Sequence, residues 1–358
     1  MKKNEITGLF FGLISLMVWA DQPEYIQGEK IPREAGKGAY NQSANYTFQN
    51  SSDLYFTADF IYWCLEQENV KLGKKVTPGS SGALGLFTGA SQTVYLDPTY
   101  KPGFQLGMGF DMAGMDDWNL YSQYTWYQNN HTTKASGEVV LGVFGSDVVI
   151  AEKASLTSHY RLNNLQISLQ RPFYSGRKLT MNFGWGLRAL WVWQKMTLNA
   201  SDLESLPVSS FTQLSMDEPL KIVSSQKSWA LGPRIGVESN WLLGKGFRAI
   251  ADAAGSILYT RYTQLDRQID GSAIYGIISN LRENTSNNLS VLRAITEAFL
   301  GIGWGSYLGV NRSYHLDLVV GYDFNIYWNQ NMCQVISHNV NAENTYLHGL
   351  NCSIRFDF

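Results

Sequence analysis

Eight charged side chains interrupt stretches in which apolar and polar residues alternate, and their types and spacing suit the passage of ions or polar solutes. All eight fall on the polar positions of the two-residue alternation, here called the polar parity. They are Asp111, Arg188, Arg234, Glu238, Arg293, Glu297, Asp317 and Asp323. If these groups and Arg355 face a common aqueous path, they set its ion preference, as rings of charge do in pores. If they pair with one another, they form a salt-bridged plug. Both interpretations stay open, because the choice depends on the width of the enclosed space.

The glycine clusters and the histidines offer less chemistry. Gly184, Gly186, Gly301 and Gly303 recur at every second residue inside alternating stretches, whereas a phosphate-binding loop must lie between a strand and a helix. We expect these glycines to leave room for aromatic or charged neighbours. The five histidines show no close ligand pair and no HExxH pattern, so the sequence predicts no metal site, no cofactor and no catalytic residues.

One enzyme remains as an alternative. His338 and His348 lie close to the last long connection, where they could join an aspartate at the mouth of a ten-stranded outer-membrane protease. Acid–base catalysis depends on hydrogen-bond geometry that a sequence does not show. We therefore predict that the chain is not an enzyme.

The elements that must position the inner charges are β-strands. Apolar residues recur with a period of two in about ten stretches, near 54–64, 104–112, 118–126, 165–170, 179–191, 229–241, 247–259, 293–304, 314–328 and 350–358. Turns near 114, 176, 245 and 311 are short, whereas the links 67–100, 128–154, 199–225, 263–287 and 330–344 are long and polar. This plan predicts an all-β, up-and-down antiparallel transmembrane barrel of 8–14 strands with short periplasmic turns and long extracellular loops.

Composition separates a lipid-facing barrel from a soluble β-sandwich. Charged residues make up only 16% of the chain and aromatic residues 13%, and no apolar run is long enough for a membrane-spanning helix. Most tryptophans lie on the apolar parity near strand ends, as in an aromatic belt. The predicted belt contains Trp118, Trp126, Trp191, Trp229, Trp241, Trp304 and Trp328, and Ile354, Phe356 and Phe358 mark the strand that closes the barrel.

Two segments precede the predicted barrel, which spans 51–358. Residues 1–20 combine Lys2, Lys3 and an apolar run, as in a secretory signal peptide, and 21–50 form a polar N-terminal arm that we expect to have little order. The full chain has 28 basic and 30 acidic residues, a balance that does not favour nucleic acid.

Three cysteines cannot all pair within one exported chain. Cys64 and Cys352 fall at apolar strand positions and serve as small hydrophobic residues, whereas Cys333 lies in a polar stretch. Cys333 is therefore the predicted reactive thiol and a candidate for an intermolecular disulfide.

The sequence resembles the pore-forming major outer membrane proteins of the Legionella type, which also occur in Chlamydia-like bacteria. The matching stretches are ADFIYW at 58–63, KPGFQLGMGFDM at 101–112, GWGLRALWVWQK at 184–195, GPRIGVESNWLLGKGF at 232–247 and IRFDF at 354–358. The resemblance implies an outer-membrane barrel with pore activity and supplies no catalytic residues.

The predicted function is therefore a porin-like barrel of the bacterial outer membrane that lets small hydrophilic solutes or ions diffuse through. Expected partners are outer-membrane lipids, those solutes, the barrel assembly machinery, and a homo-oligomer or disulfide-linked envelope partners. The alternative is a structural or adhesive surface barrel whose lumen is plugged and whose extracellular loops carry the function.

Overall fold

The structure is a computed structural model, and it describes residues 41, 43–46, 53–76, 91–112, 117–144, 147–207, 214–216, 219–270, 281–286, 288–309, 314–333 and 342–358. The described residues form one antiparallel sheet of 14 strands. The strands are β1 (Leu54–Gln67), β2 (Lys71–Val76), β3 (Ser91–Tyr95), β4 (Thr99–Met112), β5 (Trp118–Phe144), β6 (Asp147–Tyr174), β7 (Leu179–Pro207), β8 (Leu214–Met216), β9 (Leu220–Gly244), β10 (Phe247–Asp270), β11 (Leu281–Ser286), β12 (Leu289–Leu308), β13 (Tyr314–Asn331) and β14 (Glu343–Asp357). The described residues contain no helix that is long and apolar enough to cross a membrane.

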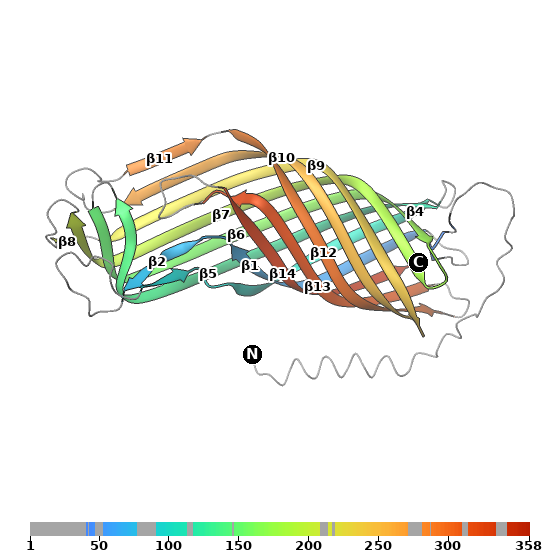
Figure 1. Cartoon of the computed structure of the whole chain (residues 1–358). Coiled ribbons are helices and arrows are strands. Elements are labelled where there is room, and N and C mark those ends of the chain that lie inside the picture. The colour runs from blue at the N-terminus through green and yellow to red at the C-terminus, as the bar shows by residue number, and fades with distance from the viewer. Residues whose placement is uncertain are drawn as a thin grey trace.

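Ten of the strands close into a ring (Figure 1), which confirms the predicted barrel. The order of neighbours is β5, β4, β1, β14, β13, β12, β10, β9, β7 and β6, and β6 pairs again with β5. The first and last strands form one seam, in register from Tyr55 opposite Asp357 to Gln67 opposite Thr345. Closure leaves no strand edge in the ring, and in hydrocarbon every backbone N–H and C=O must find such a partner.

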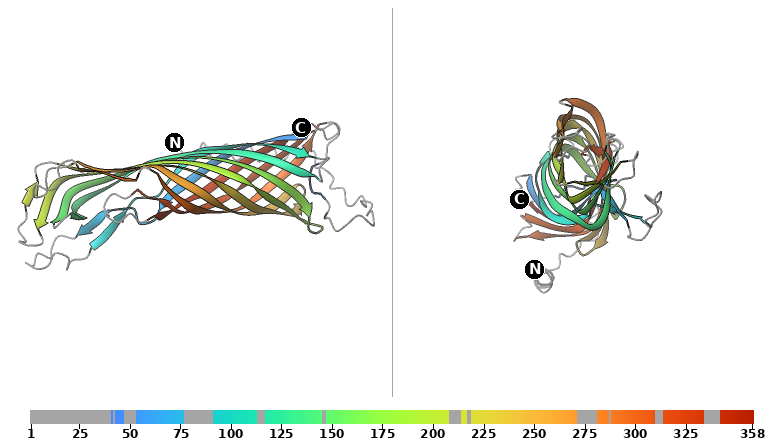
Figure 2. Two further views of the ribbon diagram at one scale, coloured as in Figure 1. Left: turned by 90° about the horizontal axis from the view of Figure 1, so that it is seen from above. Right: turned by 90° about the vertical axis from the view of Figure 1, so that its left-hand side faces the viewer.

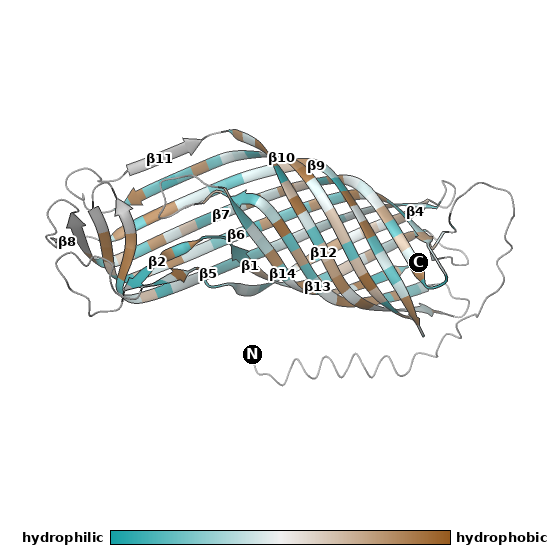
Figure 3. Cartoon of the chain, viewed as in Figure 1, coloured by the Kyte–Doolittle hydropathy of each residue, from teal (hydrophilic) through white to brown (hydrophobic). Residues whose placement is uncertain are grey.

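The outer face of the ring is apolar, as the alternation predicts. Leu300 and Ile302 of β12 are 67% and 60% exposed, and Trp185 and Leu187 of β7 are 54% and 58% exposed. Figure 3 shows the corresponding alternation of apolar and polar residues along each strand of the ring. Side chains this large and this exposed are stable only against lipid or a partner, because contiguous apolar surface is rare on soluble proteins.

Several long links contain strand, contrary to the prediction of polar loops. Strands β5 and β6 stay paired from Asn119 opposite Gln170 to Phe144 opposite Asp147, so the predicted loop 128–154 is a two-stranded extension. Strands β7, β9 and β10 are also extended, and Figure 2 shows these five strands continuing beyond the ring as a curved sheet. The prediction failed because a strand outside the membrane needs no strict alternation, and polar residues such as Thr132, Thr133 and Lys134 follow one another here.

The interior contains alternating polar and apolar layers, which β7 illustrates. Its inward residues are polar or Gly up to Arg188. An apolar layer of Leu190 and Val192 follows, then the polar Gln194, and then a second apolar layer of Met196, Leu198 and Ala200. The last three belong to an apolar core that lies between the strand extensions and the β2–β3 pair. The polar part, near the short turns, is where most of the predicted charges meet.

Candidate functional site

The polar part of the barrel encloses a cavity of about 390 Å³. Its lining combines ten charged residues with Asn, Gln, Ser, Thr and Tyr side chains from all ten strands of the ring. The charged residues are Asp59, Arg188, Arg234, Glu238, Arg248, Asp252, Glu297, Asp317, Asp323 and Arg355. Six of them belong to two ion-paired groups, and the other four are carboxylates that take part in none of the ion pairs found between described residues.

The central group is a buried trio on three strands. Glu297 of β12 accepts from both Arg188 of β7 and Arg234 of β9; the Arg234 Nε to Glu297 Oε2 distance is 2.9 Å. Arg188 is only 3% exposed. The trio links three strands across the lumen, and a buried charge of this kind is stable only when paired.

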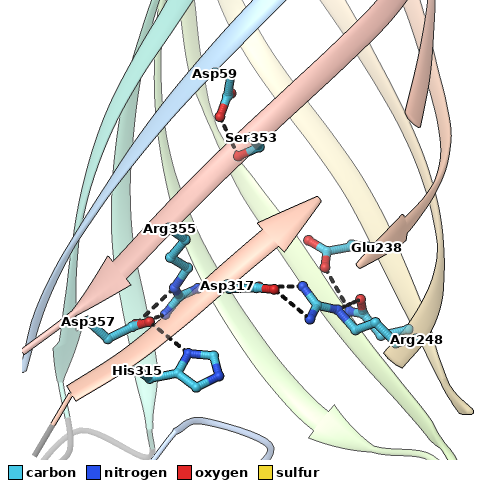
Figure 4. A network of polar contacts seen from close by, with 9 residues as sticks. Asp59, Glu238, Arg248, His315, Asp317, Ser353, Arg355 and Asp357 are labelled. Carbon is cyan, nitrogen blue, oxygen red and sulfur yellow. Dashed lines mark hydrogen bonds and ion pairs between the residues drawn. The ribbon is translucent and has the colours of Figure 1, made fainter. Parts of the chain in front are cut away.

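The second group lies closer to the short turns (Figure 4). Arg248 of β10 donates from Nη1 to Asp317 Oδ1 at 2.8 Å, and Arg355 of β14 donates to Asp357 Oδ1. His315 Nδ1 lies 3.1 Å from the second oxygen of Asp357. The Arg248–Asp317 pair spans from β10 to β13 across β12, the Arg355–Asp357 pair lies within β14, and His315 joins β13 to β14. These contacts connect three strands at this end of the lumen.

Two inner carboxylates are held by neutral donors. Asp323 accepts from Trp63 Nε1 and Asn351 Nδ2, each at 2.9 Å. Asp59 accepts from Gln123 Nε2 at 3.0 Å and from the hydroxyl of Ser353. Counted formally, the cavity lining contains six carboxylates and four guanidinium groups.

The structure brings together six of the eight residues predicted to line a pore. Arg188, Arg234, Glu238, Glu297, Asp317 and Asp323 line the cavity. Asp111 is buried at the turn end of β4, outside the lining. Arg293 lies beyond the apolar layer, where its Nε is 3.4 Å from the hydroxyl of Tyr262. A role of these eight residues in conduction stays a prediction.

A short segment before β1, which sequence reasoning assigned to a poorly ordered arm, contributes to the site. Ser43 pairs with Phe173 of β6, and the Ala44 amide donates to the Pro172 carbonyl at 3.1 Å. The Asn45 side chain donates to Asn119 Oδ1 at 2.9 Å. The segment therefore runs along the turn end of the lumen and brings the next residue inside.

The next residue along the chain, Tyr46, lines the cavity. Its ring stacks on His315, with centroids 3.9 Å apart, and the Arg355 guanidinium carbon lies 5.4 Å from the ring centroid. Both contacts are favourable, because the imidazole offers a parallel ring face and the cation meets the aromatic quadrupole. No sequence signal marked Tyr46, which has no alternating neighbours.

An apolar layer bounds the polar cavity at its other end. The layer is a ring of inward side chains from nine strands, and Tyr127 and Tyr160 are its largest fully buried members. Its members are Ile61, Trp63, Leu65, Tyr127, Tyr160, Leu162, Leu190, Val192, Ala230, Leu258, Ile295, Tyr327 and Leu347. Tyr127 is fixed by a 2.8 Å hydrogen bond from its hydroxyl to the Trp63 carbonyl. The lumen is thus closed by packed side chains at this level.

Two of the predicted glycines make room for inner side chains: a Cβ atom on Gly301 would overlap the ring of Phe299, and one on Gly303 would crowd the guanidinium of Arg248. A Cβ atom on Gly186 would instead overlap the backbone of Ile167. Gly109 and Gly107 make room in the same way for the rings of Tyr55 and Tyr121. These two rings stack with centroids 5.9 Å apart.

The predicted belt tryptophans fall into two sets. Trp118, Trp241 and Trp304 lie near the short turns, where they pair with Met112, Leu179 and Phe247. Trp126, Trp191, Trp229 and Trp328 lie farther from the short turns, and β5, β7 and β9 continue well beyond their tryptophans. Two strands carry a tryptophan of each set. Trp118 and Trp126 of β5 are eight residues apart and Trp229 and Trp241 of β9 are twelve, which corresponds to about 27 and 40 Å along the strand. A tilt of about 45° reduces this to roughly 19–28 Å, close to the ~25 Å apolar band of outer-membrane barrels.

The last strand, β14, pairs with β1 and closes the ring. Ile354 and Phe356 of β14 face outward, and the Phe358 amide donates to the Leu54 carbonyl at 3.2 Å. Phe358 also stacks on Phe56 of β1, with centroids 5.6 Å apart.

The structure is at odds with a reactive Cys333. This residue is 3% exposed and belongs to the apolar core of the extension, and burial raises the pKa of its thiol to about 12. Its Sγ lies 3.9 Å from the Gln194 carbonyl. A disulfide to another chain would require Cys333 to leave this core. The polar sequence around it did not reveal the burial, because the partners come from distant strands.

The histidines of the proposed protease do not meet an aspartate among the described residues. His338 lies outside them. His348 lies on the outer face, where Nε2 is 3.4 Å from Glu66 Oε1 and Nδ1 is 2.5 Å from the Tyr322 hydroxyl. Cys64 lies opposite His348 in the β1–β14 register. Sequence reasoning missed this cluster, because its members are distant along the chain.

A closed ten-stranded ring with an apolar outer face, two sets of tryptophans and a polar interior defines an integral β-barrel of the outer membrane. The family model described as "Legionella pneumophila major outer membrane protein precursor" matches residues 46–358, and the chain belongs to this family. This confirms the resemblance and the location of the protein in the outer membrane. No curated protein matches the chain.

Solved structures that are similar to the chain include three outer-membrane proteins. The outer membrane protease OmpT from Escherichia coli is 10% identical with a TM-score of 0.38, covering 88% of this chain and 99% of its own. The Pseudomonas putida toluene transporter TodX is 8% identical with a TM-score of 0.22, covering 86% and 89%. LpxR from Salmonella typhimurium is 8% identical with a TM-score of 0.22, covering 85% and 100%.

Proposed function

We propose that the chain is a narrow pore through which ions and small hydrophilic solutes diffuse passively across the outer membrane. The observation that carries the proposal is the polar, ion-paired cavity of about 390 Å³ inside the closed ring. An interior that only had to be filled would need no charges, since buried ion pairs are often no better than apolar packing of the same volume.

We infer a closure at each end of this cavity. Tyr46 and its segment occupy the turn end, and the apolar layer around Tyr127 and Leu190 closes the other. An apolar constriction blocks ions by excluding water, so modest displacement of its side chains opens the path. We therefore expect brief, small openings rather than the large steady conductance of wider barrels, because ten strands enclose a narrow lumen.

The charge of the lining suggests selectivity for cations. Six carboxylates face four guanidinium groups. Asp59 and Asp323 have only neutral hydrogen-bond donors, so their charge is less compensated than that of Glu297. Fixed negative charge at a constriction attracts cations.

Liposomes that contain the folded chain test the proposal. A salt gradient should dissipate faster than in empty liposomes, and a monosaccharide should enter faster than a trisaccharide. Permeability equal to that of empty liposomes would contradict a pore. The matched control is the chain left unfolded in urea before reconstitution.

A second candidate function is a closed barrel whose extension binds at the cell surface. It is favoured by the continuous apolar layer and by the five strands that continue beyond the ring. Shortening the β5–β6 extension should then abolish attachment to host cells while leaving permeability unchanged. Unchanged attachment would contradict this candidate. The assembly machinery and a homo-oligomer stay predictions.

A further inference from the structure

Three metal-binding side chains meet on the outer face of the barrel, away from the polar lumen. Cys64 and Glu66 lie two residues apart on β1, so their side chains share a face. His348 of β14 lies directly opposite Cys64 in the register. The thiol, a carboxylate oxygen and an imidazole nitrogen all lie within 4.8 Å of one another.

The geometry points to a zinc site, and we propose that Cys64, Glu66 and His348 bind Zn²⁺. Zinc takes Cys, His and carboxylate ligands in tetrahedral sites. Two ligand atoms that each lie about 2.1 Å from a tetrahedral ion are about 3.4 Å apart. His348 Nε2 and Glu66 Oε1 are 3.4 Å apart.

The surroundings of His348 orient the ring for this role. Its Nδ1 lies 2.5 Å from the Tyr322 hydroxyl, so Nδ1–H can donate to the tyrosine oxygen and leave Nε2 free to bind a metal. A hydrogen bond on the second ring nitrogen is the usual support of a metal-bound histidine. Tyr100 packs edge-on at 6.1 Å and limits rotation of the imidazole.

Access and coordination also fit a cation from the external medium. Cys64 is buried at 2% exposure, whereas the Glu66 side chain is 48% exposed. The ion can therefore enter beside Glu66, and a water molecule can complete four ligands. The soft thiolate favours zinc over calcium and magnesium, which prefer oxygen ligands.

The position gives the ion a structural effect. Its ligands come from the first and last strands of the ring, so zinc would connect the two sides of the seam that closes the barrel. An ion that binds only the folded chain stabilises it by mass action, about 100-fold in the folding equilibrium at 100 times its Kd. This inference is independent of the pore.

The test is titration of the full chain, folded in detergent micelles under reducing conditions, with Zn²⁺ against a competing chelator. One equivalent should bind. Tyr322→Phe removes only the hydrogen bond that supports the imidazole and should weaken zinc binding about 10- to 100-fold. Cys64→Ser and His348→Gln each remove a ligand and should weaken binding at least as much. The control Cys352→Ser removes another thiol of the same seam, which lies outside the cluster, and should leave the Kd unchanged.

Cobalt provides a second readout that does not depend on affinity. Co²⁺ in place of zinc should show a thiolate-to-metal charge-transfer band in the wild-type chain and in Cys352→Ser, but not in Cys64→Ser. Glu66→Gln should fold normally, because Glu66 is half exposed, and should bind zinc more weakly. Absence of saturable binding to the wild-type chain, or the same Kd for Cys64→Ser, would overturn the site.

Discussion

The ring of Tyr46 stacks on the imidazole of His315, and the 3.9 Å between their centroids ties a segment that precedes the barrel to the inside of β13. Tyr46 also lines the cavity that contains the ion pairs. The N-terminal segment is thereby part of the lumen.

Replacing Tyr46 by Ala should release this segment. The stacking on His315 and the cation–π contact with Arg355 would be lost, and together these are worth about 1–3 kcal/mol. Amide exchange at Ala44, whose N–H donates to the Pro172 carbonyl, should then accelerate. Tyr46→Phe keeps the ring and is the control; unchanged exchange in Tyr46→Ala would show that the segment is held by other contacts.

Replacing Glu297 by Gln should destabilise the barrel by about 3–5 kcal/mol, because Arg188 and Arg234 would both lose their buried counter-charge. Urea unfolding in micelles or liposomes measures the change. The exposed pair Lys153–Asp202 on the extension offers a matched control, and Lys153→Ala should cause no measurable change. Equal stability of Glu297→Gln and the wild type would mean that the trio does not hold the ring.

Leu300→Arg should destabilise the inserted barrel by about 2–4 kcal/mol, the cost of an arginine at the bilayer midplane. Ile295 of β12 pairs with Tyr327, so the level of Trp328 on β12 is one residue before Ile295. Leu300 lies about midway between that level and Trp304. Leu308→Arg, beyond Trp304 at the turn end, should cost only about 0–1 kcal/mol. Reversible unfolding from liposomes distinguishes them, and equal costs would place the membrane elsewhere.

The sequence predicted the ring closely, because a lipid-facing strand must alternate over its whole length. Leu300, Ile302 and Trp304 could only point outward together. The short turns near 114, 176, 245 and 311 then set the pairing of consecutive strands. Closure by β14 followed from an even number of strands and from the apolar residues of the last strand.

The interior was harder to predict, because an inward side chain meets partners from several strands. Arg188 reads as polar and Leu190 as apolar, yet both face the lumen at different depths. The apolar layer therefore escaped notice, since its members lie on the parity that carries charges elsewhere. The extension of β5 and β6 was missed because, outside the membrane, no strict alternation is needed.

The conducting chain should prefer cations. In planar bilayers with a salt gradient near pH 8, the reversal potential should have the sign that cation flow gives, and Asp59→Asn with Asp323→Asn should shift it toward zero, because these carboxylates lack an arginine partner. Asp202→Asn, on the exposed extension, is the control. A reversal potential that favours anions would refute the charge assignment.

The most direct test of a pore with two closures is single-channel recording in planar bilayers of the wild-type chain, Tyr46→Ala and the double variant Tyr46→Ala with Leu190→Ala. We predict rare, small conductance steps for the wild type, more frequent steps once Tyr46 is removed, and the largest and longest openings when the apolar layer is also reduced. No conductance steps in any of the three folded proteins would contradict the account.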